Sequence, residues 1–255
     1  KGLAVVAGTQ YRHHAKFKLT IDEIHKGRIG RIVAGRAYYN AGTLWHRGQK
    51  KEWSDVEYQV RNWLYFDWLS GDHIVEQHIH TIDVTNWVMQ SPPVRAVAMG
   101  GRQVRSQQKY GNIYDHFAVD YEYPGGAHVT SMCRQMRGTS NHVGAYFEGT
   151  KGVAAPYQGK IHTDPVWTSP DLRGIGTAYV QEHTDLIESV RAGKPLNETE
   201  QVCDSTLTAI MGREAAYTGQ MVTWEQMLSS ELDYGVTEEF KPLAVRPVPM
   251  PGPRQ

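Results

Sequence analysis

Apolar residues along the chain follow two spacings, which predict strands in some segments and helices in others. Short runs that are apolar throughout, or that alternate apolar with polar positions, predict strands. These strands are expected at residues 3–8, 29–39, 94–100, 115–123, 127–136 and 143–148. The run from Leu3 to Gly8 is apolar throughout and is typical of a buried parallel strand. Pro124, Gly125 and Gly126 separate two alternating runs and predict the turn of a β-hairpin.

Helical spacing appears in the remaining ordered segments. Helices are expected at residues 14–25, 72–89, 179–192 and 200–217, with a short one at 223–229. Pro92 and Pro93 end the second of these, because proline cannot continue a helix. Residues 42–55 and 156–176 are rich in polar and turn-forming residues and are expected to be loops. The last ten residues hold four prolines and predict an extended tail.

The order of these elements predicts an α+β fold. Several strands follow one another between the long helix and the late helices, which favours an open, mostly antiparallel sheet with helices on one face. The other face must then be covered or exposed, and we expect a homo-oligomer contact there. The main domain is expected at residues 14–245, followed by a proline-rich tail at residues 246–255.

Charge and cysteine content exclude several classes of protein. The chain has 27 Lys and Arg against 27 Asp and Glu among 255 residues. Without a basic excess or a basic run, neither a nucleic acid nor an anionic membrane is an expected partner. Cys133 and Cys203 are too few for a disulfide framework, and the apolar runs are too short to span a membrane. None of these features identifies a cellular compartment.

The segment from Gly71 to Asp83 carries the strongest chemical signal. It contains three histidines and three carboxylates, and it leads into an apolar stretch. On a regular helix, Asp72, Glu76 and His80 would lie on one face, because residues four apart are neighbours. A carboxylate one turn before an imidazole is a plausible pair for proton transfer. We therefore predict His80 and Glu76 as catalytic residues.

A metal site at this segment is the alternative. His73, Glu76 and His80 could face the same side of a helix and act as ligands. His78 and His80 point about 200° apart on a regular helix and cannot both be ligands. Metal is the weaker interpretation, and we predict no metal ligand.

Other residues could bind a substrate or a cofactor near this segment. The stretch 63–68 is aromatic, and aromatic rings stack on the apolar faces of sugars, although they are more often part of a core. Arg12 and Arg61 suit bidentate recognition of a sugar or of a cofactor phosphate. The full set of predicted substrate-binding residues is Arg12, Arg61, Trp63, Tyr65, His73, His78, His116, Arg134 and His183.

Several segments together resemble the C-terminal part of the Gfo/Idh/MocA oxidoreductases. They include Val5 to His13, the Gly27-Arg-Ile-Gly-Arg-Ile32 stretch, Arg61-Asn-Trp63 and the Glu182 to Pro195 helix. The segment from Gly71 to Asp83 is similar to the G-G-x-x-x-D-x-G-x-H-x-x-D motif of that family. The resemblance covers nearly the whole chain.

The resemblance implies a mechanism as well as a fold. His80 falls on the catalytic histidine of the family, Glu76 on the acid that orients it, and Asp83 on a structural aspartate. His78 departs from the motif, which has a small residue at that position. In the family, the histidine accepts a hydroxyl proton while hydride passes from a sugar carbon to NAD or NADP.

Two signatures of the family are absent from these 255 residues: the G-x-G-x-x-G fingerprint after a first strand and a Glu-Lys-Pro segment. Both would lie upstream. Residues 1–13 are therefore expected to be the end of a nucleotide-binding domain, with residues 3–8 as the last strand of its Rossmann sheet.

Three functions are compatible with these observations. The favoured one is an NAD(P)-dependent oxidoreductase that acts on a sugar, polyol or glycoside, with this chain supplying the substrate-binding domain. Arg12 and Arg61 would then contact the cofactor or the substrate. The alternatives are a cofactor-free lyase or hydratase acting on keto-sugars, with or without a metal, and a non-catalytic sugar-binding or assembly module.

Overall fold

The computed structural model describes residues 2–170, 172, 177–235 and 243–252. Within them, one nine-stranded sheet has the order β8-β7-β6-β5-β1-β4-β3-β2-β9. Neighbouring strands run antiparallel except that β1 pairs with β4 in parallel. The strands are β1 Ile32–Ala41, β2 Arg95–Gly101, β3 His116–Tyr123, β4 Ala127–Gln135, β5 His142–Gly149, β6 Gly152–Ala155, β7 Lys160–His162, β8 Trp167–Thr168 and β9 Val222–Thr223.

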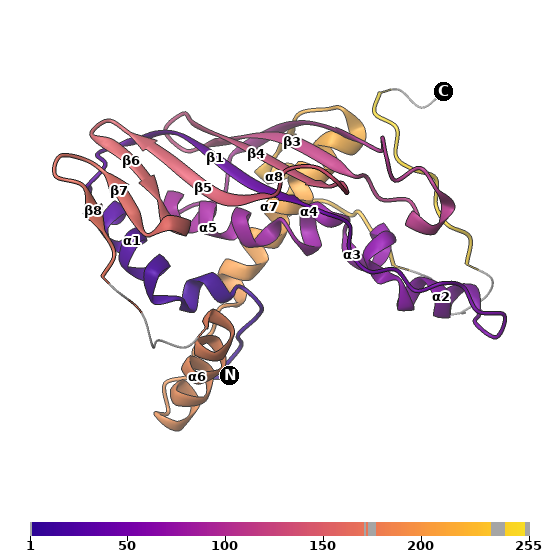
Figure 1. Cartoon of the computed structure of the whole chain (residues 1–255), viewed down its shortest axis with the longest axis horizontal. Helices are drawn as coiled ribbons and strands as arrows, with labels where there is room; N and C mark the ends of the chain where they lie inside the picture. Colours follow the sequence, from indigo (N-terminus) through magenta and orange to yellow (C-terminus); the bar gives the residue numbers. More distant parts are fainter. Residues whose placement is uncertain (1, 171, 173–176, 236–242, 253–255) are drawn as a thin grey trace.

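The helices gather on one face of this sheet. Figure 1 shows α1, α4, α5 and α7 along that face, while α6 extends away from the sheet beside the N-terminal residues. The helices are α1 Ala15–His25, α2 Asp55–Arg61, α3 Asp67–Ser70, α4 His73–Glu76, α5 Ile79–Met89, α6 Ala178–Arg191, α7 Thr199–Thr218 and α8 Trp224–Leu228. The predicted α+β class, with helices on one face of an open, mostly antiparallel sheet, is confirmed.

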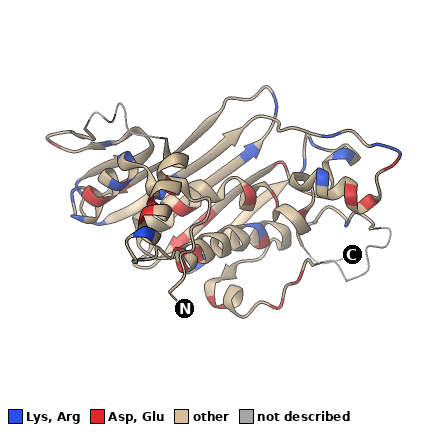
Figure 2. Ribbon diagram, turned by 90° about the horizontal axis from the view of Figure 1, so that it is seen from below, with Lys and Arg blue, Asp and Glu red and all other residues tan. Residues whose placement is uncertain are grey.

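Alternation along the strands explains why only one face is covered. In β3, Phe117, Val119 and Tyr121 are buried, and the residues between them are only partly buried. The inward side chains form one core with β4 and α7, and a second core lies between α1, α5 and the strands β5 to β7. Figure 2 shows acidic and basic residues interspersed over the helices, in keeping with the balanced charge. No helix in the described ranges is long and apolar enough to cross a bilayer.

Most of the predicted elements are confirmed within a few residues. The hairpin is formed by β3 and β4, and the late helix expected at 200–217 is α7. The loop expected at 156–176 instead contains the short edge strands β7 and β8, and part of that range lies outside the described residues. The proline-rich tail lies against its own chain, where Pro249 O accepts a hydrogen bond from Tyr114 Oη at 2.8 Å.

The strand expected at residues 3–8 does not form a ladder with the described residues, and its place in a Rossmann sheet stays a prediction. This segment makes only an isolated parallel bridge from Val5 to Asn197, and the side chains of Leu3 and Val5 are 64% and 42% exposed. A buried parallel strand needs a neighbour on each side. The described residues supply only this single bridge.

The predicted continuous helix at residues 72–89 is also wrong, because it breaks between α4 and α5. Gln77 leaves helical geometry with φ −126° and ψ −50°. The backbone N–H groups of Gln77 and His78 both donate to the carbonyl oxygen of His73, at 3.2 and 3.1 Å. His78 turns toward the sheet at this break, where its Nε2 lies 2.6 Å from Ser131 Oγ on β4.

Candidate active site around His80 and Glu76

Asp72 anchors the start of the segment that carries the candidate residues. Its side chain is fully buried and accepts hydrogen bonds from the backbone N–H of His73 at 2.6 Å and of Tyr114 at 2.8 Å. Tyr217 Oη on α7 donates to the same carboxylate at 2.6 Å. The sequence placed Asp72 on the face shared by Glu76 and His80, but the structure uses it to cap α4 and to join α4 to α7.

His80 lies in the first turn of α5, among aromatic side chains. Its ring centre is 6.1 Å from that of Tyr11 and 6.5 Å from that of Tyr39. His80 Nδ1 is buried without a hydrogen-bond partner among the described residues, while the residue as a whole is only partly buried. Burial lowers the pKa of His80, although Asp83 opposes this effect. A neutral imidazole at neutral pH can accept a proton.

Glu76 is the last residue of α4 and is held from the sheet side. Gln135 Nε2, at the end of β4, donates to Glu76 Oε1 at 3.0 Å and to Gln77 Oε1 at 2.7 Å. Burial raises the pKa of Glu76 to about 7, although the hydrogen bond from Gln135 opposes it. Glu76 can therefore gain or lose a proton near neutral pH, which is what general acid–base chemistry requires.

Glu76 does not orient His80 by a hydrogen bond in the structure. None of the hydrogen bonds between described residues joins them, because the helix break separates α4 from α5. The prediction that one regular helix stacks the two side chains is therefore wrong. Both residues remain close to Tyr39, whose pKa is raised first by burial and then by the charge of Glu76.

His73 and His78, which were predicted to bind substrate, lie in the core. Each is only 1% exposed. His73 Nδ1 lies 3.0 Å from Asp72 Oδ1, and His78 is bound to Ser131 as described above. Burial lowers the pKa of His78 to about 3, so that it stays neutral in the folded protein. Both histidines stabilise the segment instead of facing a cavity.

Arg12 is held by an ion pair. Arg12 Nε donates to both carboxylate oxygens of Asp83, at 3.0 and 2.9 Å, and its guanidinium lies 5.2 Å from the ring centre of Trp87. Ser205 Oγ on α7 donates to the same aspartate at 2.8 Å. This arrangement fits the structural role expected for Asp83. Arg12 also lines a small cavity of about 230 Å³ between α5 and α7.

Arg61 and Trp63 lie at the end of α2 and just after it, and the ring of Tyr65 lies next to the guanidinium of Arg105. Arg61 Nε donates to Glu57 at 2.8 Å and its guanidinium lies over Trp53, and Trp63 is 39% exposed. Tyr65 is fully buried, with its hydroxyl donating to the carbonyl oxygen of Trp45 at 2.7 Å. Tyr65 is therefore a core residue.

His116 and Arg134 are cross-strand neighbours on the open face of the sheet. His116 Nδ1 lies 2.7 Å from Asp115 Oδ1, and Arg134 Nη2 donates to the carbonyl oxygen of Ser140 at 2.8 Å. His80 is on the helical face, so these two residues are not brought to it. His183 is exposed on α6, with Nδ1 2.8 Å from the carbonyl oxygen of Tyr179.

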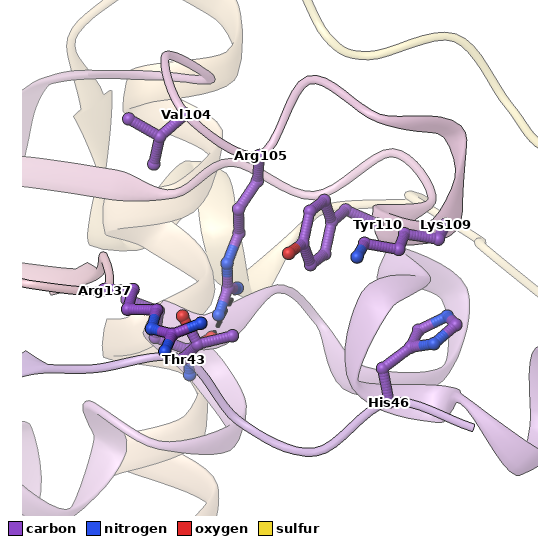
Figure 3. Close-up of a pocket in the computed structure, with 8 residues that line it drawn as sticks. Thr43, His46, Val104, Arg105, Lys109, Tyr110 and Arg137 are labelled. Carbon is purple, nitrogen blue, oxygen red and sulfur yellow. Dashed lines mark hydrogen bonds between the residues drawn. The ribbon is translucent and has the colours of Figure 1, made fainter. Parts of the chain in front are cut away.

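A larger cavity of about 530 Å³ opens next to Gln135, the residue that holds Glu76. Figure 3 shows Arg105 reaching from the loop before β3 toward Thr43 and Arg137, with His46 and Lys109 on the other wall. His80 does not line this cavity. Among the described residues, no three His, Cys, Asp or Glu side chains are grouped to hold a metal, so His73, Glu76 and His80 do not form the set considered above.

Sequence reasoning missed the residues that complete this region. Tyr11 and Tyr39 lie beside His80, and Gln135 and Arg105 connect Glu76 to the cavity. Gln135 could have been noticed, because it continues the inward positions of β4 with a polar side chain. The loop that carries Arg105 has no comparable pattern.

The raised pKa of Glu76 leads to a pH-dependent prediction for stability. The folded-state pKa of about 7 exceeds the ordinary value of 4.5. The folded state therefore binds more protons in this window, and stability falls as the pH rises through it. We therefore compare the free energy of unfolding of Glu76→Gln with that of the wild type by urea unfolding. The difference, variant minus wild type, should be roughly 2–3 kcal/mol larger at pH 8 than at pH 4. Glu52→Gln, at an exposed position, serves as the control. An equal effect of Glu76→Gln at both pH values would contradict the prediction.

Comparisons with known proteins identify the domain type. Residues 19–155, more than half of the chain, match the family model described as the GFO/IDH/MocA C-terminal domain. No curated protein matches by sequence.

Solved structures with the same fold are similar at low sequence identity. They include an aldose-aldose oxidoreductase from Caulobacter crescentus, with TM-score 0.65 and 18% identity, over 86% of this chain and 64% of that one. A myo-inositol 2-dehydrogenase from Lactobacillus plantarum has TM-score 0.62 and 17% identity, and the match covers 85% of this chain and 63% of that one. A levoglucosan dehydrogenase in complex with NADH and levoglucosan has TM-score 0.65 and 17% identity, and the match covers 89% of this chain and 68% of that one. The chain thus spans less than two thirds of the first two structures.

Proposed function

The chain belongs to the GFO/IDH/MocA family, and from this membership we propose that it supplies the substrate-binding domain of an NAD(P)-dependent carbohydrate or polyol oxidoreductase. The observation that carries the proposal is His80, a partly buried imidazole on α5 whose pKa is lowered by burial, with Nδ1 enclosed by protein. In this proposal His80 takes the role of the family's catalytic histidine, as the resemblance of residues 71–83 to the family motif implies. The similarity to dehydrogenases of inositol and levoglucosan supports a carbohydrate substrate.

In this proposal His80 acts as the general base. Its neutral ring accepts the proton of a substrate hydroxyl through Nε2, because Nδ1 is enclosed by protein. Tyr11 and Tyr39 flank the ring and limit its motion. The ion pair between Arg12 and Asp83 holds α5 in place, so that His80 projects from a rigid helix. Glu76 holds or releases a second proton close to Tyr39 rather than orienting His80 directly.

The nicotinamide cofactor supplies the hydride acceptor when bound. The residues described here fit the substrate side of the reaction. Arg12 and Arg61 are both engaged in ion pairs, and the sequence has no Gly-rich dinucleotide fingerprint. In this proposal, Arg12 and Arg61 are therefore not assigned to the cofactor.

A direct assay tests this function. The full-length protein is incubated with NAD or NADP and a panel of sugars, polyols and glycosides, and reduced nicotinamide is followed by fluorescence. We expect reduction of one cofactor that depends on one class of carbohydrate. Cleavage or dehydration of a keto-sugar without any nicotinamide would favour the lyase alternative. Carbohydrate binding without turnover would favour the non-catalytic one.

We further propose that copies of the chain associate through the open sheet face. Three apolar side chains point outward from the strands on this face. They are Val97 and Met99 on β2, which are 49% and 76% exposed, and Met132 on β4, which is 37% exposed. Apolar side chains on an uncovered sheet are typical of an interface. Sedimentation of the wild type and of Met99→Asp measures this association. A monomeric wild type at micromolar concentration would contradict it.

A further inference from the structure

The cavity next to Gln135 is strongly cationic. It is lined by Arg105, Lys109 and Arg137 together with His46, and none of the acidic side chains that the structure describes lines it. Figure 3 shows Arg105 and Arg137 approaching each other at one end of the cavity. Like charges brought together in a partly enclosed space repel each other unless an anion compensates them.

Arg105 is the most unusual of these residues, because its charge is buried without a carboxylate partner. The residue is 2% exposed, and none of the ion pairs between described residues includes it. Nη1 donates to Gln135 Oε1 at 2.5 Å, while Nε and Nη2 have no hydrogen-bond partner among the described residues. Nε and Nη2 are the two guanidinium nitrogens whose N–H bonds point in the same direction. In arginine, this edge binds a carboxylate or phosphate through two parallel hydrogen bonds. Both nitrogens are buried here, so a small displacement of the side chains around Arg105 accompanies contact with a ligand.

The acidic groups close to Arg105 are already engaged elsewhere. Asp115 Oδ2 accepts from the backbone N–H of Gln103, Val104 and Arg105, and its Oδ1 binds His116. The carboxylate of Asp72 already accepts the three hydrogen bonds described above, from two backbone N–H groups and from the Tyr217 hydroxyl. Glu76 is bound by Gln135, and its burial favours the neutral acid.

The loop that carries Arg105 is held in place before any ligand arrives. Arg102 donates to the carbonyl oxygens of Arg105, of Gly111 and of Gln107. Gly111 has φ +54° and lies against the carbonyl oxygen of Tyr65, so a side chain at this position would collide with the backbone. The rings of Tyr65 and Tyr110 each lie 5.5 Å from the Arg105 guanidinium. Such preorganisation reduces the entropic cost of binding.

We propose that this cationic cavity binds the carboxylate or phosphate group of an anionic carbohydrate, with Arg105 as the main ligand and with Arg137 and Lys109 at the entrance. The inference rests on the proposed function only for the carbohydrate part of the ligand. The anion recognition follows from the charges alone. Gln135 connects Arg105 to Glu76, so a sugar acid or sugar phosphate held here would lie one side chain away from Glu76.

Calorimetric titration of the full-length protein, without nicotinamide and at constant ionic strength, tests the inference. The probes are glucuronate, glucose 6-phosphate, glucose and inorganic phosphate. We expect at least one anionic sugar to bind clearly more tightly than glucose. Arg105→Met should weaken this binding about tenfold or more, because a charge-assisted bidentate contact is lost. Arg137→Ala should weaken it about threefold.

Controls separate the possible causes of an effect. Arg31→Ala removes an exposed positive charge outside the cavity and should leave binding unchanged. If Arg105→Met does not fold, as judged by circular dichroism, Arg137→Ala and Lys109→Ala decide the question. Equal binding of glucose and glucuronate, or equal affinities in Arg137→Ala and Arg31→Ala, would overturn the inference. Binding of inorganic phosphate alone would overturn its carbohydrate part. Because no turnover is measured, these results are independent of hydride transfer.

Discussion

Replacement of His80 by glutamine is expected to lower kcat for carbohydrate oxidation roughly 10²- to 10⁴-fold, the range typical of a lost general base. Glutamine preserves polarity and approximate size but cannot accept a proton at neutral pH. The wild-type kcat/KM should also stay high down to pH values below 6.5, since burial lowers the pKa of His80 from that value and keeps the base neutral there. Steady-state kinetics over pH 5 to 8 measure both effects.

The matched control for this prediction is His162→Gln, because His162 is exposed on β7. Its kcat should stay close to that of the wild type. If the two variants have similar kcat values, His80 is not the base. A large increase in KM with unchanged kcat in His80→Gln would indicate a role in binding alone.

The second large effect is expected for stability. Asp72→Ala should lower the free energy of unfolding by roughly 3–5 kcal/mol, because it leaves buried donors without an acceptor. These donors are the backbone N–H groups of His73 and Tyr114 and the hydroxyl of Tyr217. Urea unfolding measures the change. Asp120→Ala removes a partly exposed carboxylate paired with His128 and should change stability by less than about 1 kcal/mol.

Backbone geometry gives this prediction a second test. Asp72 has φ 73° and ψ 164°, a region that is essentially restricted to glycine and costs other residues about 1–3 kcal/mol. Asp72→Gly loses the same hydrogen bonds but relieves the strain. The free energy of unfolding of Asp72→Gly should therefore be about 1 kcal/mol higher than that of Asp72→Ala. The opposite order would show that the positive φ is not a source of strain.

Local sequence patterns predicted the elements that depend on local interactions. The alternation in β3 and β4 and the Pro124-Gly125-Gly126 turn were sufficient for the hairpin. The apolar spacing was sufficient for α7. Such patterns depend on the face that each residue presents to a core, and a single sequence contains this information.

The parts that were not predicted depend on contacts between distant residues. The break after Glu76 accompanies the contact of His78 with Ser131, which is 53 positions further along the chain. Nothing in the spacing of residues 72–89 reveals it. The connection from Glu76 through Gln135 to Arg105 likewise joins a helix, a strand and a loop that are far apart in the sequence. The sequence therefore identified the segment that carries the candidate residues but not the directions in which they point.

The position of β1 has a consequence for how the domain is synthesised. β1 is the first strand of the sheet in the chain, yet it lies between β4 and β5, with Ala37 opposite Ser131 on one side and Ala145 on the other. During translation, both edges of β1 stay unpaired until about a hundred further residues have left the ribosome. Exposed edges of this kind invite pairing with other chains, and contacts so distant in sequence form slowly. A nascent chain that stops within the hairpin should therefore be prone to aggregation and depend on chaperones.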